Sequence, residues 1–347
     1  MSFDKSKITR ASRLSIAMLI SFCYVTYVGV SSGVWVIMTC AIVLFDNPTY
    51  GGTLTKSHLR FMGTFFAALM SLIFIVGFAN NVIINLIGIV VGVFIAAYLY
   101  MDSKQNYLGG LISWTMPIIL INNNNIKSAF LRLLNISIGI FIAWIMLRFF
   151  YPEYARDKML RTTQKTIREL RIMLATLSDN SLSALQIQQV FLEREPIILA
   201  EMARFNRWIE EAKPETAKSP EYVGAATKAY WHARRLYRLF SVLIYHFDCS
   251  HIASNPKLQR YINQSLVQFD GITETIEKNM TQFIQPQDLV IHTSILQQQE
   301  LEYDLHHERL STTTIFELIQ EEGNHMVADL IIVFQSRKAN NYYAATS

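Results

Sequence analysis

The chain has 347 residues, of which 51% are hydrophobic and 17% are charged, and its formal net charge is +4. This charge density is low for a soluble protein of the same length, and the small basic excess gives no reason to expect a nucleic-acid partner. Cys23, Cys40 and Cys249 show neither disulfide nor metal-ligand spacing. We therefore expect no metal and no cofactor, and the absence of catalytic motifs argues against an enzyme.

A break in composition divides the chain. Charged residues are scarce from Leu14 to Phe150 and return at ordinary density after Tyr151. Such a break predicts two domains. We expect an all-α protein with a cytoplasmic N-terminus at 1–12, a six-helix transmembrane bundle at 13–150, a cytoplasmic α-helical domain at 151–337 and a flexible tail at 338–347.

Six apolar runs account for the first domain. They cover 13–30, 33–46, 60–79, 82–100, 107–121 and 130–150. The second and fifth are shorter than the ~20 residues that span a bilayer, so we expect them to be tilted or shielded inside the bundle. Basic residues before the first run also resemble a signal peptide, but the further runs directly after it favour a membrane helix.

Basic residues mark one side of the membrane. They occur in the N-terminus, in the loops that carry Lys56 and Lys104, and after the last run at Arg148. With six crossings all four positions lie on the cytoplasmic side by the positive-inside rule. We expect a multi-pass protein of the inner membrane with both termini in the cytoplasm and the asparagine-rich stretch 122–127 outside.

A short internal repeat links the third and sixth runs. Leu59–Gly63 and Leu131–Asn135 align with an offset of 72 residues, and each lies at the start of its run. Repeats of three helices would have opposite orientations, as in many transporters. A chance similarity between apolar helices explains so short a match equally well.

The region after Pro152 is amphipathic. Apolar residues from Leu160 to Leu177 alternate spacings of three and four, a coiled-coil-like seam. Further helices are predicted at 182–213, 221–247, 256–283, 286–308 and 312–337. The helix that carries the Leu160–Leu177 seam also has a basic stripe, which faces anionic lipid headgroups or attracts anions. The stripe consists of Lys158, Arg161, Lys165 and Arg168.

Arg60 and Arg132 are the leading candidates for a functional site. Each lies at or just inside the end of an apolar run, where a charge is unfavourable unless it reaches water, the interface or an anion. Guanidinium groups bind carboxylates bidentately, so the pair could bind an anion from opposite ends of a pathway. The alternative is that both side chains extend to the lipid headgroups.

Other features allow both a functional and a structural interpretation. The small-residue stripe of Gly63, Ala67 and Ser71 favours close helix packing. Asp46 and His58 are the best-placed groups for proton coupling, and the turn-rich stretch 46–53 is a plain loop or a gating element. His246, Asp248, Cys249 and His251 include metal-type ligands, but nothing fixes their geometry.

In the second and third runs Trp35 begins an apolar run, a turn with glycines and Thr53 follows, and then comes Arg60-Phe61-Met62-Gly63-Thr64. This pattern resembles the fusaric acid resistance and aromatic acid exporter family. Plant aluminium-activated malate transporters are similar in layout. Ala67 departs from the family, which often has glycine there. Many bacterial members carry two six-helix units, and this chain has one, so the resemblance implies a homodimer and allows an accessory periplasmic partner.

The resemblance implies a membrane transporter that exports organic, in particular aromatic carboxylate, anions. Arg60, Gly63 and Thr64 occupy the family motif, and we expect Arg60 to bind the carboxylate while Trp35 and Trp114 hold the ring. Arg132 is the second candidate ligand. Two alternatives stay open: a membrane-anchored helical scaffold that binds a cytoplasmic partner, and a passive anion channel.

Overall fold

The computed structural model describes residues 5–29, 33–46, 49–77, 81–103, 105–121, 126–179, 181–217, 220–247, 252, 254–281 and 312–345. Within these ranges the chain forms helices and no strand, which confirms the all-α prediction. It divides into two compact units, Met1–Tyr154 and Ala155–Ser347, and the division falls close to the break in composition. Each unit is described by itself below.

Apolar helices make up the described part of the first unit. They are α1 (Lys5–Val28), α2 (Val34–Asp46), α3 (Tyr50–Gly77), α4 (Val82–Tyr100), α5 (Asn106–Ile121) and α6 (Ile126–Phe149). Among the described residues, four helices, α1, α3, α4 and α6, are long and apolar enough to cross a membrane, while α2 and α5 are apolar but shorter. These two helices correspond to the second and fifth apolar runs, which are shorter than a bilayer span.

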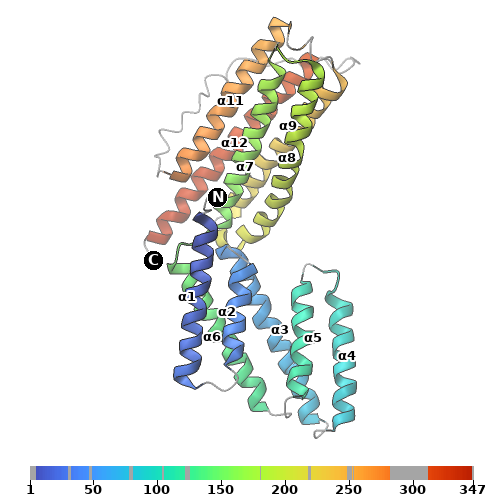
Figure 1. Cartoon of the computed structure of the whole chain (residues 1–347), viewed down its shortest axis with the longest axis vertical. Helices are drawn as coiled ribbons and strands as arrows, with labels where there is room; N and C mark the ends of the chain where they lie inside the picture. The colour runs from blue at the N-terminus through green and yellow to red at the C-terminus, as the bar shows by residue number, and fades with distance from the viewer. Residues whose placement is uncertain are drawn as a thin grey trace. The chain divides into compact units, whose positions relative to one another are not determined.

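The first unit is built from two half-bundles, each with its own hydrophobic cluster. Ala17, Val36 and Ala143 join α1, α2 and α6 in one cluster. Ala67, Ala96 and other apolar side chains join α3, α4 and α5 in the second. Figure 1 shows α4 and α5 on one side of the unit, α1, α2 and α6 on the other, and α3 between them. The half-bundles meet mainly along α3 and α6.

Glycines allow the helices of each half-bundle to approach closely. A Cβ atom on Gly63 would lie 2.8 Å from the Leu111 Cβ, and one on Gly139 would lie 2.7 Å from the Val36 carbonyl oxygen. Real Cβ atoms do not approach so closely, so both positions need a hydrogen as side chain. These contacts support the packing interpretation of the small residues on α3.

Helix α3 begins ten residues before the apolar run that predicts it. The Thr49 hydroxyl accepts a hydrogen bond of 3.1 Å from the Gly52 N–H, an N-cap that starts the helix there. The Tyr50 N–H donates to the Glu153 carbonyl at 2.8 Å. The plain-loop interpretation of 46–53 is therefore wrong for 50–53, because the capping hydroxyl and the buried face of Gly51, Gly52 and Thr53 support a helix despite the glycines.

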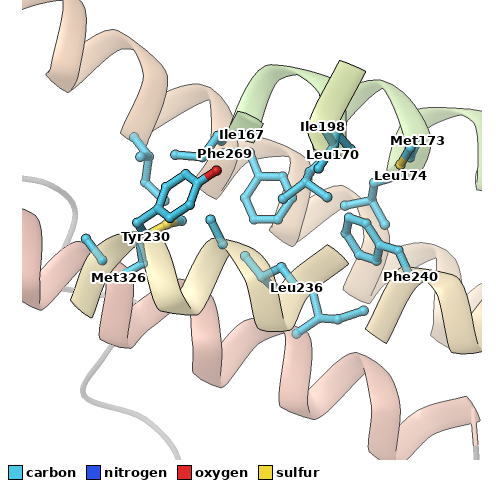
Figure 2. Packing of buried hydrophobic residues seen from close by; sticks show 14 of the residues in the cluster. Ile167, Leu170, Met173, Leu174, Ile198, Tyr230, Leu236, Phe240, Phe269 and Met326 are labelled. Atoms are coloured by element: carbon cyan, nitrogen blue, oxygen red, sulfur yellow. The ribbon is translucent and has the colours of Figure 1, made fainter. Parts of the chain in front are cut away.

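The described part of the second unit consists of α7 (Ala155–Leu177), α8 (Ala184–Ala212), a 3₁₀ turn (Pro214–Thr216), α9 (Pro220–His246), α11 (Pro256–Thr281) and α12 (Thr312–Ala345). The predicted apolar seam on α7 is buried, and Figure 2 shows Ile167, Leu170 and Leu174 within a core shared with Phe240 and Phe269.

Two predictions for the second unit need comment. The predicted helix at 286–308 lies outside the described residues. Helix α12 continues to Ala345, into the segment where the sequence predicts a flexible tail from 338. Residues 338–345 contain neither glycine nor proline, so no residue in this stretch interrupts the helix.

Candidate anion-binding site

Arg60 lies inside the first unit on the buried face of α3. Its side chain is 4% exposed. The Nε–H donates to the Thr39 hydroxyl on α2 at 3.1 Å, and Nη1 donates to the Tyr107 hydroxyl on α5 at 3.0 Å. Arg60 therefore connects its own half-bundle to the other through neutral partners.

Arg132 occupies a similar position on α6. Its side chain is 5% exposed, and the guanidinium carbon lies 3.6 Å from the centroid of the Trp35 ring on α2. The Nε atom is buried and has no hydrogen-bond partner in the described part of the chain. This packing is incompatible with the interpretation in which Arg132 extends to lipid headgroups.

The structure brings the two arginines together. Arg60 contacts Thr39 and Arg132 contacts Trp35, which lie about one helical turn apart on α2. Because α3 begins at Tyr50, Arg60 lies about 15 Å along the helix rather than at its end. These contacts favour one shared site, and the expectation that the pair acts from opposite ends of a pathway stays a prediction.

No described residue neutralises this pair, because neither Arg60 nor Arg132 forms a salt bridge with a described carboxylate. Buried charges are normally paired, and an unpaired buried charge is strongly unfavourable. The arrangement is therefore suited to bind an anion that supplies the missing negative charge.

A pocket of about 250 Å³ lies between α3 and α6, and its α3 lining precedes Arg60 on that helix. Most of its lining is apolar or aromatic, and it consists of Tyr50, Thr53, Leu54, Ser57, Ser137, Ile140, Phe141, Trp144 and Leu147. Ser57 lies one helical turn before Arg60. The Trp144 Nε1–H donates to the Tyr50 hydroxyl at 3.2 Å, which fixes two of the aromatic rings.

The sequence model of the fusaric acid resistance protein family matches residues 9–286, most of the chain. The chain belongs to the fusaric acid resistance protein family. It is a multi-pass membrane protein of a transporter family. No individually curated protein matches the chain.

Two further residues of the family motif, Gly63 and Thr64, have structural contacts next to Arg60. The Thr64 hydroxyl is buried and donates to the Arg60 carbonyl at 2.9 Å. Gly63 faces Leu111 and allows α5 to approach α3. Their direct binding of substrate, which the family motif implies, stays a prediction.

The predicted aromatic pair is not brought together in this fusaric acid resistance protein. Trp35 lies under Arg132, whereas Trp114 is 65% exposed on α5. Sequence reasoning missed Tyr107 and the aromatic residues of the α3–α6 pocket. The spacing of Phe141 and Trp144 by one helical turn on the last apolar run is the signal that could have found the pocket.

The candidates for proton coupling differ in their surroundings. Asp46 forms an ion pair with Lys56, and the Lys56 ammonium lies 4.9 Å from the centroid of the Tyr107 ring. Asp46, Lys56 and Tyr107 thus form a chain of contacts that leads from the exposed surface to Arg60. His58 is exposed on α3.

The basic stripe of the second unit is partly neutralised. Lys158 lies over the Trp208 ring at 5.4 Å, and the Lys165 ammonium is 3.8 Å from a Glu201 oxygen. Arg161 and Arg168 are exposed. Of the suggested metal-type residues, Asp248, Cys249 and His251 lie outside the described residues, whereas His246 is the last residue of α9.

Proposed function

We propose that the chain exports organic anions, in particular aromatic carboxylates. The observation that carries this proposal is the buried pair of Arg60 and Arg132 without an acidic partner in the described part of the chain. Two like charges repel strongly in a medium of low dielectric constant, and an anion between them removes this repulsion. A membrane-anchored scaffold would gain nothing from such a pair.

The α3–α6 pocket supports an aromatic substrate. Tyr50, Phe141 and Trp144 supply faces and edges on which a ring can pack, and Ser57 connects the pocket to the turn that carries Arg60. In this arrangement the arginines hold the carboxylate and the pocket holds the ring. The ring site thus replaces the predicted site on Trp35 and Trp114.

The proposed topology has six crossings, both termini and the second unit in the cytoplasm, and the inner membrane as its location. Half of α5 is buried, including Leu111, Thr115 and Met116, and this burial supports short crossings shielded by neighbouring helices. We further propose the homodimer that the family resemblance implies. Crosslinking in native membranes tests the dimer.

Transport by purified protein in liposomes tests the function. We expect wild-type protein to move benzoate. The flux of Arg60→Ala should be at least about tenfold lower, because the variant lacks one of the two buried positive charges that attract the anion. Equal amounts of both proteins in the liposomes, measured by immunoblot, serve as the control. Unchanged flux in Arg60→Ala would contradict the proposed role. Dependence of the flux on a proton gradient separates an antiporter from a passive channel.

A further inference from the structure

The contacts of the two arginines repeat each other. The offset of 72 residues that relates Arg60 to Arg132 also relates Trp35 to Tyr107. In the structure Arg60 contacts Tyr107, and Arg132 contacts Trp35. Each arginine thus binds the aromatic residue at the equivalent position of the other repeat, a correspondence that an accidental match of apolar helices does not explain.

The half-bundles follow the same relationship. An offset of three helices relates α1 to α4, α2 to α5 and α6 to α3. It thus relates the helices of the first hydrophobic cluster to those of the second. It also relates the two short helices, α2 and α5. The carbonyl groups that two glycines approach are at matched positions, Val36 for Gly139 and Leu108 for Gly63, although the offset of 72 relates Gly63 to Asn135 and not to Gly139.

One contact breaks the repeat. Arg60 donates its Nε–H to Thr39, and the offset of 72 places Leu111 at the equivalent position on α5. Leucine has no acceptor. The repeat relationship thus places Leu111, and not a hydroxyl, next to the Nε of Arg132. That Nε is buried without a partner in the described part of the chain, while the Nε of Arg60 is satisfied.

We infer that Arg132 is the principal ligand of the transported carboxylate and that Arg60 is a positioning residue, held between Thr39 and Tyr107. This inference rests on the proposed function. A carboxylate can accept from the free Nε–H of Arg132 and from an adjacent Nη–H in the bidentate arrangement that guanidinium groups favour. The Trp35 ring beneath the guanidinium fixes its plane.

Two substitutions at Leu111 test this assignment in the full-length protein. Leu111→Thr supplies the hydroxyl that Thr39 supplies in the other repeat, whereas Leu111→Val has the same shape without the hydroxyl. Calorimetric titration with benzoate should give about tenfold weaker binding for Leu111→Thr than for Leu111→Val, because the added hydroxyl competes for the Nε–H. Without benzoate, Leu111→Thr should have the higher Tm, because it satisfies a buried donor.

The matched change in the other repeat is Thr39→Val. It removes the hydroxyl from Arg60, and the affinity for benzoate should stay within about threefold of wild type, because Arg132 is unaffected. Equal affinities of Leu111→Thr and Leu111→Val, or a larger loss in Thr39→Val than in Leu111→Thr, would overturn the assignment while the proposed function stands. Wild-type protein that binds no benzoate would overturn both.

Discussion

At the scale of single residues, Arg60 and Arg132 show how neighbours decide the role of a buried charge. Both are embedded in apolar helices, and both are at least 95% buried. Arg60 has two neutral oxygen acceptors, whereas Arg132 has an aromatic face and one donor without a partner among the described residues. We therefore propose that Arg132 is the better anion ligand.

Tyr107 is expected to stabilise the position of Arg60. Tyr107→Phe removes the acceptor of the 3.0 Å hydrogen bond and leaves a buried charged donor unsatisfied. We expect a loss of about 1 kcal/mol or more in the free energy of unfolding. Thermal unfolding in detergent measures it. Tyr100→Phe is the control, because no described residue binds the Tyr100 hydroxyl, and an equal loss there would contradict the prediction.

The stability of the second unit should depend on pH in the alkaline range because of Tyr237. Burial, with a smaller contribution from its hydrogen bond to Glu195, raises the pKa of Tyr237 to about 12. A raised pKa means that the protonated hydroxyl stabilises the fold below pH ~10 and that this contribution is lost as pH rises towards 12.

Unfolding measured between pH 9 and pH 12 tests this prediction. The free energy of unfolding of wild type should fall towards that of Tyr237→Phe, because the variant lacks the hydroxyl that titrates. A difference between the two proteins that stays constant over this range would contradict it. The pKa of Tyr230 is also raised by burial, but this residue is present in both proteins and cancels in the comparison.

At the scale of elements, hydropathy predicted the helices better than their ends. The lengths of α4 and α5 follow the apolar runs closely, since burial in lipid or protein requires such runs. The start of α3 does not, because it depends on a capping hydroxyl at Thr49 and on a backbone contact with Glu153, which lies far away in the sequence.

Gly139 is expected to be essential for the packing of α2 on α6. In Gly139→Ala the new methyl group would lie 2.7 Å from the Val36 carbonyl oxygen, and a backbone atom cannot move aside locally. We expect a destabilisation of about 1–3 kcal/mol and a lower Tm. Gly110→Ala is the matched control, because nothing lies within 4 Å of its added methyl group. Similar Tm values for both variants would contradict the prediction.

At the scale of the whole molecule, the topology can be tested from loops at opposite ends of one helix. In a protein without its three natural cysteines, Asn123→Cys should react with a membrane-impermeant maleimide added to intact cells. Ser103→Cys should react only after the cells are permeabilised, because positive-inside topology places this loop in the cytoplasm. Labelling of Ser103→Cys in intact cells would contradict the proposed orientation.

Several features could be predicted from the sequence alone: the apolar helices, the short second and fifth runs, the break between the two units and the family resemblance. These are properties of contiguous residues, and hydropathy and motif spacing express them directly. The tertiary structure was needed to show that Arg60 and Arg132 both contact α2 and that Trp114 is exposed. It was also needed to show that the Nε of Arg132 has no hydrogen-bond partner among the described residues. Those facts depend on how helices far apart in the sequence pack. The residues around an arginine in the sequence do not indicate which residue of another helix will contact it.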